Sequence, residues 1–225
     1  MALLYSQRSA RQDSPAAWTR LVAAFATASI ACAGSWTVVV ALPVVEREFG
    51  SARAGASFPY ACAMIGFAAG TMGLGRMSDR YGIVAPILLS AALLAAGYVA
   101  AGLAPTLAVF ALAHVVIGFG ASAGFAPLIA DLSHWFTARR GLAVVIVAAG
   151  NYVSGAVWPP LMQAAMEDWG WRAAHLGAGL LCAALLLPLS LLFRLRLDAH
   201  AARAAGVGAE AARAALGLSP RALQI

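Results

Sequence analysis

Five long stretches of this chain contain no Asp, Glu, Lys or Arg, and they limit its possible folds more than any other feature of the sequence. They are residues 21–45, 54–75, 81–130, 141–166 and 173–193. Because an α-helix rises about 1.5 Å per residue and the hydrocarbon core of a bilayer is about 30 Å thick, about 20 apolar residues cross it once. Four stretches suit one crossing each, and residues 81–130 have room for two, with a proline-containing turn at 103–106. The pattern predicts an all-α, polytopic membrane protein with six transmembrane helices.

The composition excludes the ordinary soluble alternatives. Hydrophobic residues make up 62% of the chain and charged residues 11%, against about 45–50% and about 25% in soluble domains. A cleaved signal peptide does not explain residues 21–45, because its apolar region would be roughly 7–15 residues long and similar stretches follow here. Cys32, Cys62 and Cys182 fall inside apolar stretches, where they are interpreted as small core residues rather than as a disulfide or metal site.

The basic residues predict the orientation in the membrane. All fifteen are arginines, and most lie in the leader, in the second and fourth loops and in the tail. The positive-inside rule therefore places both termini in the cytoplasm, in the plasma (inner) membrane. This distribution accounts for the net charge of +6 without a nucleic-acid partner.

The predicted organisation has three parts. Residues 1–19 form a cytoplasmic leader, residues 20–198 the helical bundle, and residues 199–225 a cytoplasmic tail rich in Ala and Arg. Such a tail has few large side chains to bury, so we expect it to be weakly helical or disordered. Small residues at helix-packing spacing are expected to let the helices approach closely: Gly66, Gly70, Gly120 and Gly124. The six spans are predicted at about 21–45, 55–75, 83–102, 107–130, 141–163 and 173–193.

A short charged segment, GRMSDRYG at residues 75–82, separates the second and third predicted spans. Glycines at its two ends allow a tight turn, and Asp79 can cap a helix or pair with an arginine. A plain turn with solvated charges is the alternative. The pattern G-x-x-[ST]-D-R-x-G resembles the signature loop of the major facilitator superfamily of secondary transporters. The matching residues are Gly75, Ser78, Asp79, Arg80 and Gly82.

That resemblance implies a cytoplasmic gate. Family members usually continue with two basic residues, where this chain has Ile83 and Val84. The resemblance implies that Asp131, at the end of the fourth span, is the charge partner of the loop. Arg80, Arg139 or Arg140 would then supply the positive charge of the missing basic residues.

Three further segments resemble the monocarboxylate and oxalate/formate branch of that superfamily. They are HWFTARRGLA at residues 134–143, AAGNYVSG at 148–155 and WGWRAA at 169–174. The resemblance implies one six-helix bundle, built of two inverted three-helix repeats. This bundle would be the N-terminal half of a transporter that works by alternating access to a site at the midplane of the bilayer. The partner would be a second bundle, either a C-terminal half or another copy. Animal members of the branch often carry a lysine in the first span, but residues 21–45 contain no basic residue.

Polar side chains inside the spans are the candidates for the substrate path, because burying them in lipid is costly. His114 can titrate near neutral pH, so it is a candidate for proton relay or anion binding; a neutral, hydrogen-bonded packing role is the alternative. Asn151 and Trp158 share a helix face with Gly155 at i, i+4, i+7 spacing. Packing and interfacial anchoring are the alternatives for these residues. The full set of path candidates is Ser35, Trp36, His114, Asn151 and Trp158.

The sequence therefore predicts a secondary active transporter that moves a small solute, an organic anion such as a monocarboxylate. We expect it to be incomplete as a single bundle, because the last span ends at the basic residues 194–196 and no seventh span follows. A truncated or non-transporting membrane protein and a half-transporter that acts as a dimer are the alternatives. No phosphate loop, metal-ligand spacing or nucleophile motif occurs, so neither an enzyme nor a cofactor is predicted.

Overall fold

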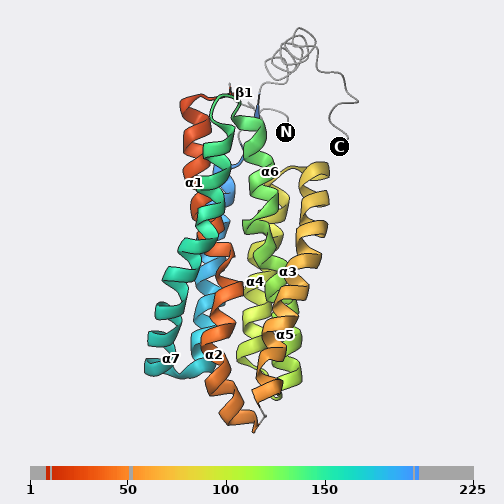
Figure 1. Ribbon diagram of the computed structural model, residues 1–225, viewed down its shortest axis with the longest axis vertical. Coiled ribbons are helices and arrows are strands. Elements are labelled where there is room, and N and C mark those ends of the chain that lie inside the picture. Colours follow the sequence, from red (N-terminus) through yellow and green to blue (C-terminus); the bar gives the residue numbers. More distant parts are fainter. Residues whose placement is uncertain (1–8, 11, 51–52, 195, 198–225) are drawn as a thin grey trace, which may run out of the picture.

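The computed structural model describes residues 9–10, 12–50, 53–194 and 196–197. Long helices run side by side along the length of the molecule (Figure 1). A short parallel pair, β1 (Ser9–Ala10) with β2 (Arg196–Leu197), lies at one end of the bundle. The helical elements are α1 (Pro15–Ala31), α2 (Ala33–Phe49), α3 (Arg53–Tyr81), α4 (Val84–Gly102), α5 (Leu107–Ala121), the 3-10 turn η1 (Ser122–Gly124), α6 (Ala126–Trp135) and α7 (Arg140–Leu192). The predicted tail, 199–225, and most of the leader ahead of residue 12 lie outside the described residues.

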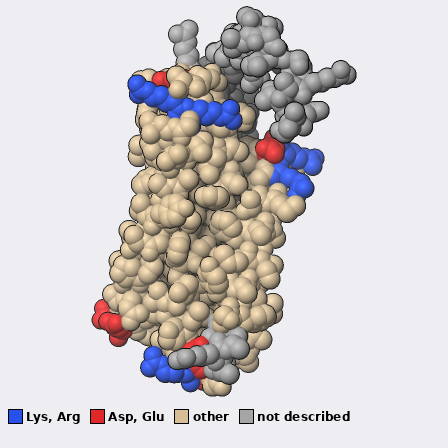
Figure 2. All heavy atoms as spheres, viewed as in Figure 1, with Lys and Arg blue, Asp and Glu red and all other residues tan. Residues whose placement is uncertain are grey.

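The described residues contain five helical segments long and apolar enough to cross a membrane. They are Pro15–Phe49, Ser57–Tyr81, Val84–Gly102, Leu107–Trp135 and Arg140–Leu192. Charged side chains gather at the two ends of the molecule, and the face shown in Figure 2 is uncharged between them. Large apolar side chains are exposed on the sides, among them Val22 (68%) and Leu180 (73%). This surface suits a lipid bilayer and would aggregate in water.

The longest helix, α7, is two helices joined at Gly170. It is continuous by hydrogen bonding over 53 residues, but Gly170 has φ 80° and ψ 158°, a conformation that glycine adopts without steric cost. The chain reverses direction there, so that the two legs of α7 run antiparallel (Figure 1). The predicted spans 141–163 and 173–193 fall on the two legs.

Two other apolar segments are interrupted where the sequence predicts single helices. Cys32 separates α1 from α2, and η1 with Phe125 (φ −124°, ψ −95°) separates α5 from α6. The interruptions contact each other, because a Cβ placed on Gly124 would lie 2.9 Å from Ala31 Cβ and 3.1 Å from Cys32 Sγ. Hydropathy does not report such breaks, since both sides remain apolar.

The predicted turn at residues 75–82 is shorter than expected, and most of the segment is helical. Helix α3 continues to Tyr81, so Gly75, Ser78, Asp79 and Arg80 occupy its last turns. Only Gly82, with φ +80°, leaves the helix, and its N–H donates to the Ser78 carbonyl at 2.8 Å. The prediction that Gly75 starts the turn was wrong, because a glycine is tolerated within a helix whose neighbouring backbone hydrogen bonds are intact.

Helices α3 and α5 pack closely through glycines. A Cβ on Gly66 would collide with the Val115 carbonyl, and one on Gly118 with the Ala63 carbonyl. Gly70 lies against Phe119, and Gly120 against Leu94 of α4. The predicted close approach through Gly66, Gly70, Gly120 and Gly124 is therefore confirmed, and it brings the backbones near enough for dispersion contacts to hold the helices in lipid.

Candidate substrate-binding site

A pocket of about 240 Å³ opens between α2, α3 and α7. Three of its lining residues, Ser35, Trp36 and Asn151, were singled out from the sequence as path candidates. The other three lie on α3 at i, i+4, i+7 spacing, which places them on one helix face. The complete lining is Ser35, Trp36, Tyr60, Met64, Phe67 and Asn151. Sequence analysis missed the α3 residues, although an aromatic and methionine stripe at that spacing was available as a signal.

The Trp36 indole and the Asn151 side chain form the polar wall of this pocket. Trp36 Nε1 donates to Asn151 Oδ1 at 3.2 Å. The indole lies against the backbone of α7 at Gly155, where a Cβ would be 2.9 Å from Trp36 Cε2. Gly155 is one turn after Asn151, so the same helix face supplies both the hydrogen-bond partner and the space for the ring.

Two further polar groups are the hydroxyls of Tyr60 and Ser35. The Ser35 oxygen is buried and has no hydrogen-bond partner among the described residues. An unpaired buried hydroxyl costs free energy unless another group satisfies it. None of the six lining residues is charged, so the pocket offers neutral hydrogen-bonding groups beside an aromatic wall.

Two predicted path residues, Trp158 and His114, do not line this pocket. Trp158 is 6% exposed, and its Nε1 donates to the Ser29 carbonyl at 2.9 Å, which fastens α7 to α1. His114 is completely buried in α5, and its Nδ1 lies 2.8 Å from the Phe110 carbonyl. Because a carbonyl only accepts, this Nδ1 carries the proton.

A second buried histidine, His175, lies beside His114 and was missed by sequence analysis. The two ring centroids are 6.0 Å apart, and Phe110 contacts both rings. His175 repeats the local geometry, since its Nδ1 lies 2.7 Å from the Trp171 carbonyl. The Nε2 atoms of both histidines are buried without a partner among the described residues. The position of His175 within an apolar span, like that of His114, was the signal that the sequence offered.

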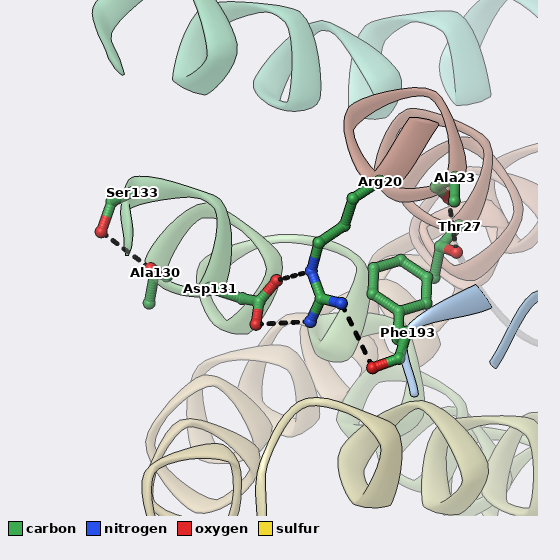
Figure 3. Close-up of polar contacts among 7 residues, drawn as sticks. All are labelled: Arg20, Ala23, Thr27, Ala130, Asp131, Ser133 and Phe193. Atoms are coloured by element: carbon green, nitrogen blue, oxygen red, sulfur yellow. Dashed lines mark hydrogen bonds and ion pairs between the residues drawn. The ribbon is translucent and has the colours of Figure 1, made fainter. Parts of the chain in front are cut away.

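The carboxylate of Asp131 pairs with Arg20 (Figure 3). The Arg20 Nε and Nη2 donate to the two Asp131 oxygens at 2.7 and 2.8 Å, and Nη1 donates to the Phe193 carbonyl at 3.2 Å. The two side chains are 5% and 16% exposed. The guanidinium also lies 4.4 Å from the Trp135 ring centroid. One arginine thus joins α1, α6 and the end of α7.

This pairing corrects the expected charge partner of Asp131, which was Arg80, Arg139 or Arg140. The Arg80 guanidinium lies over Tyr81 at 5.3 Å, and that of Arg139 over Trp18 at 5.8 Å, while Arg140 begins α7. Arg20 directly precedes the first charge-free stretch and Asp131 directly follows the third, so both lie at the same end of the bundle. The sequence analysis used the arginines only to predict the orientation and did not single out Arg20, so it missed this partner.

Asp79 is exposed at the end of α3. The two ion pairs formed by the described residues are Arg20 with Asp131 and Arg172 with Glu48, and Asp79 belongs to neither. The Arg172–Glu48 pair, at 2.7 Å, lies at the opposite end of the bundle, where Arg172 Nη1 also donates to the Ala104 carbonyl.

Asp13 caps the entry to α7. Its Oδ2 accepts hydrogen bonds from the Thr137 hydroxyl at 2.6 Å and from the backbone N–H groups of Thr137 and Ala138 at 3.2 Å. The pKa of Asp13 is lowered from its ordinary value, mainly by the hydrogen bond from the Thr137 hydroxyl. Desolvation acts in the opposite direction and raises this pKa, but its effect is smaller. The chain before α1 is thereby tied to the chain before α7.

Comparison with known proteins agrees with this architecture. The sequence-family model of the Major Facilitator Superfamily matches residues 24–222 of this chain. Human monocarboxylate transporter 11 is 30% identical over 187 residues, which cover 77% of this chain and 38% of that protein. Multidrug resistance protein Stp of Mycobacterium tuberculosis (strain CDC 1551 / Oshkosh) is 30% identical over 138 residues, covering 60% of this chain and 26% of that protein.

A third relative, monocarboxylate transporter 13 of Rattus norvegicus, is 36% identical over 109 residues, covering 42% of this chain and 26% of that protein. The chain thus spans 38% or less of the length of these three relatives. The family match covers most of the chain, and the apolar helices suit a multi-pass membrane protein, so the resemblance drawn from the sequence is confirmed. The chain belongs to the Major Facilitator Superfamily.

Proposed function

We propose that this chain forms a six-helix N-terminal bundle of a secondary transporter that moves a small organic anion, such as a monocarboxylate, by alternating access. The observation that carries the proposal is the pocket, since Ser35, Trp36 and Asn151, selected for polarity within apolar spans, come together from α2 and α7. The names of the relatives support transport in general, and two of them are monocarboxylate transporters.

The membrane topology that we propose has six crossings. The break at Gly170 makes α7 two crossings instead of one, and the other four apolar segments supply one each. The arginine distribution favours a cytoplasmic location for both termini, in the plasma (inner) membrane. Two inverted three-helix repeats would then make up the bundle.

We also propose that the charged end of α3 forms the gate. Asp79 and Arg80 are exposed there, beside the turn at Gly82, where a second bundle can meet them. An ion pair with that bundle would form when the gate closes and break when it opens. Arg139 and Arg140 lie before and at the start of α7, and Gly75, Ser78 and Gly82 shape the segment.

The function is tested by reconstituting the full 225-residue chain in liposomes and measuring uptake of radiolabelled benzoate and L-lactate. We expect saturable uptake in vesicles in which a second bundle is present, here another copy, and reduced uptake by Asn151→Ala. Crosslinking on the same vesicles reports whether the chain is a dimer. Saturable uptake by a monomer would refute the need for a second bundle, and dimers without uptake would contradict transport by this chain paired with itself.

The role of His114 in proton or anion coupling stays a prediction, with His175 as its neighbour. Its burial beside His175 places it away from the pocket lining, so any effect on substrate would be indirect. The measurement is the pH dependence of uptake by His114→Ala. An unaltered profile at normal expression would leave His114 with a packing role.

A further inference from the structure

We propose that Trp36 determines the specificity of the pocket by fixing Asn151 as a hydrogen-bond donor to a planar oxygen acceptor on an aromatic ligand. The ligand class is a one-ring carboxylate or carboxamide, held by this bundle without an ion pair. This inference rests on the proposed function, in that the pocket is taken as the substrate site.

The first step is the orientation of the Asn151 amide. An indole nitrogen has a hydrogen to donate and no lone pair to accept with, so the atom that faces Trp36 Nε1 must be the amide oxygen. That oxygen accepts at 3.2 Å. The amide nitrogen, with its two hydrogens, then points away from Trp36. It forms no hydrogen bond with another described residue, and Asn151 is partly exposed in the pocket.

The second step is the rigidity of the Trp36 ring. Its Cε2, Cδ2 and Cζ2 atoms would lie 2.9 to 3.1 Å from a Cβ on Gly155, so the ring rests directly on the α7 backbone. A ring held by such contact keeps its N–H in a fixed direction. Without that N–H, the Asn151 amide can rotate by half a turn and present its oxygen to the ligand instead of its nitrogen.

The third step is the shape of the remaining wall. Tyr60, Met64 and Phe67 of α3 give the pocket an aromatic and polarisable side. The volume of about 240 Å³ is below the roughly 300–1,000 Å³ of pockets for drug-sized ligands, so it suits one ring with a small polar group.

The fourth step concerns charge. None of the six lining residues is a cation, so this bundle offers a carboxylate only neutral donors. A carboxamide presents the same planar oxygen with the same ring, and should bind within about tenfold of the carboxylate, since a neutral donor bonds a charged acceptor only modestly more strongly than a neutral one. A site built around an arginine or lysine would reject the carboxamide far more strongly.

The test is equilibrium dialysis of radiolabelled benzoate and benzamide against the full chain in nanodiscs. We expect the two probes to bind within about tenfold of each other, and acetate, which lacks the ring, not to compete. Trp36→Phe keeps the ring but removes the donor, so both probes should bind about five- to tenfold more weakly. Asn151→Ala should weaken both by a similar factor. The double variant should lose no more affinity for the probes than either single variant, because the two residues act as one unit.

Asn151→Asp is the variant that distinguishes orientation from packing. Its carboxylate still accepts from Trp36 but has no hydrogens for the ligand, so benzoate binding should be lost while benzamide, which can donate its own N–H, is weakened less. Trp169→Phe and Tyr152→Phe are matched controls, because both side chains are exposed, at 71% and 73%, and outside the pocket lining. Both controls should bind the probes like the unmodified chain. Size-exclusion chromatography verifies that each variant is folded.

Several outcomes would overturn the inference. Additive losses in the double variant, wild-type affinity in Trp36→Phe, or rejection of benzamide by about a hundredfold would each contradict it. Absence of saturable binding of either probe to the unmodified chain would also refute the ligand class. Uptake in liposomes is measured separately, so lactate uptake without benzoate binding would overturn this inference and leave the transport proposal standing.

Discussion

At the scale of single residues, Arg20 and Asp131 form an ion pair that joins α1 to α6. Both groups are largely buried, and the guanidinium donates to both carboxylate oxygens and to the Phe193 carbonyl. In a protein interior, removing one partner leaves an uncompensated charge, whereas replacing both by apolar groups is often nearly neutral.

We therefore predict that Arg20→Leu and Asp131→Leu each lower the free energy of unfolding by about 3–5 kcal/mol, and that the double variant is more stable than either. Unfolding in mixed detergent micelles measures all three. Glu48→Gln is the control, since the Glu48–Arg172 pair is 41% exposed on each side, and such exposed pairs contribute about 0–1 kcal/mol. A double variant as unstable as the sum of the singles would show that the two residues act separately.

Asp13 gives a prediction about pH. Its folded pKa is below the ordinary value of 3.8, mainly through the Thr137 hydroxyl. The cap therefore contributes stability above pH 3.8, and the contribution is lost as the pH falls through the lowered folded pKa. Asp13→Asn suits the test because Asp13 has φ 54°, which asparagine tolerates. The difference in stability between the unmodified chain and this variant should be small and constant near neutral pH, and it should vanish in acid. A difference that grows in acid would contradict a stabilising role for the Asp13 carboxylate.

At the scale of the helices, the contact between α3 and α5 depends on the absence of side chains. A Cβ on Gly66 would collide with the backbone carbonyl of Val115, which cannot move aside as a side chain can. Gly75, on the same helix, has nothing within 4 Å of its Cβ position. The two glycines thus make a matched pair within α3.

We predict that Gly66→Ala destabilises the bundle by about 1–3 kcal/mol, because the helices must separate. Gly75→Ala should be neutral or stabilising by about 0.5–1 kcal/mol, because alanine favours the helix. Thermal unfolding in detergent measures both. Equal effects of the two substitutions would mean that helix propensity, not close packing, sets the requirement for glycine.

At the scale of the whole molecule, the bundle is fastened at both ends by different contacts. Arg20 with Asp131 closes one end, and Arg172 with Glu48 closes the other, where α4 ends at Gly102. Asp79 lies near the start of α4, and therefore at the opposite end from Arg172. Its charge is exposed and belongs to neither of these two pairs of the described residues, as the proposed gate requires.

We predict that Asp79→Asn reduces the rate of uptake and leaves membrane insertion intact, because the change removes a charge without altering the packing of α3. Uptake into liposomes and the amount of protein in the membrane are the two measurements. Asp168→Asn is the control, as an exposed carboxylate beside the break at Gly170. Unchanged uptake kinetics in Asp79→Asn would reduce the segment to a plain helix end.

Much of the fold and part of the site could be predicted from the sequence. The charge-free stretches predict the helices, since a backbone in lipid must form its hydrogen bonds within the helix. Ser35, Trp36 and Asn151 stand out as polar groups in apolar surroundings, and the structure gathers them around one pocket. His175 carried the same kind of signal, and Arg20 borders the first apolar stretch, but neither was predicted to form these contacts.

Other features were decided by the tertiary structure alone. Tyr60, Met64 and Phe67 line the pocket rather than face lipid because of how α3 is rotated, and an apolar side chain suits either environment. The same holds for the breaks at Cys32 and Phe125, which leave hydropathy unchanged. Asp131 pairs with Arg20, not with the arginines nearer in sequence, because the packing of α1 beside α6 brings those two side chains together. The sequence by itself determined which segments are helices in lipid, since that depends on local hydrogen bonding and apolarity; the contacts between them depend on helix rotation and crossing, which only packing of the whole bundle sets.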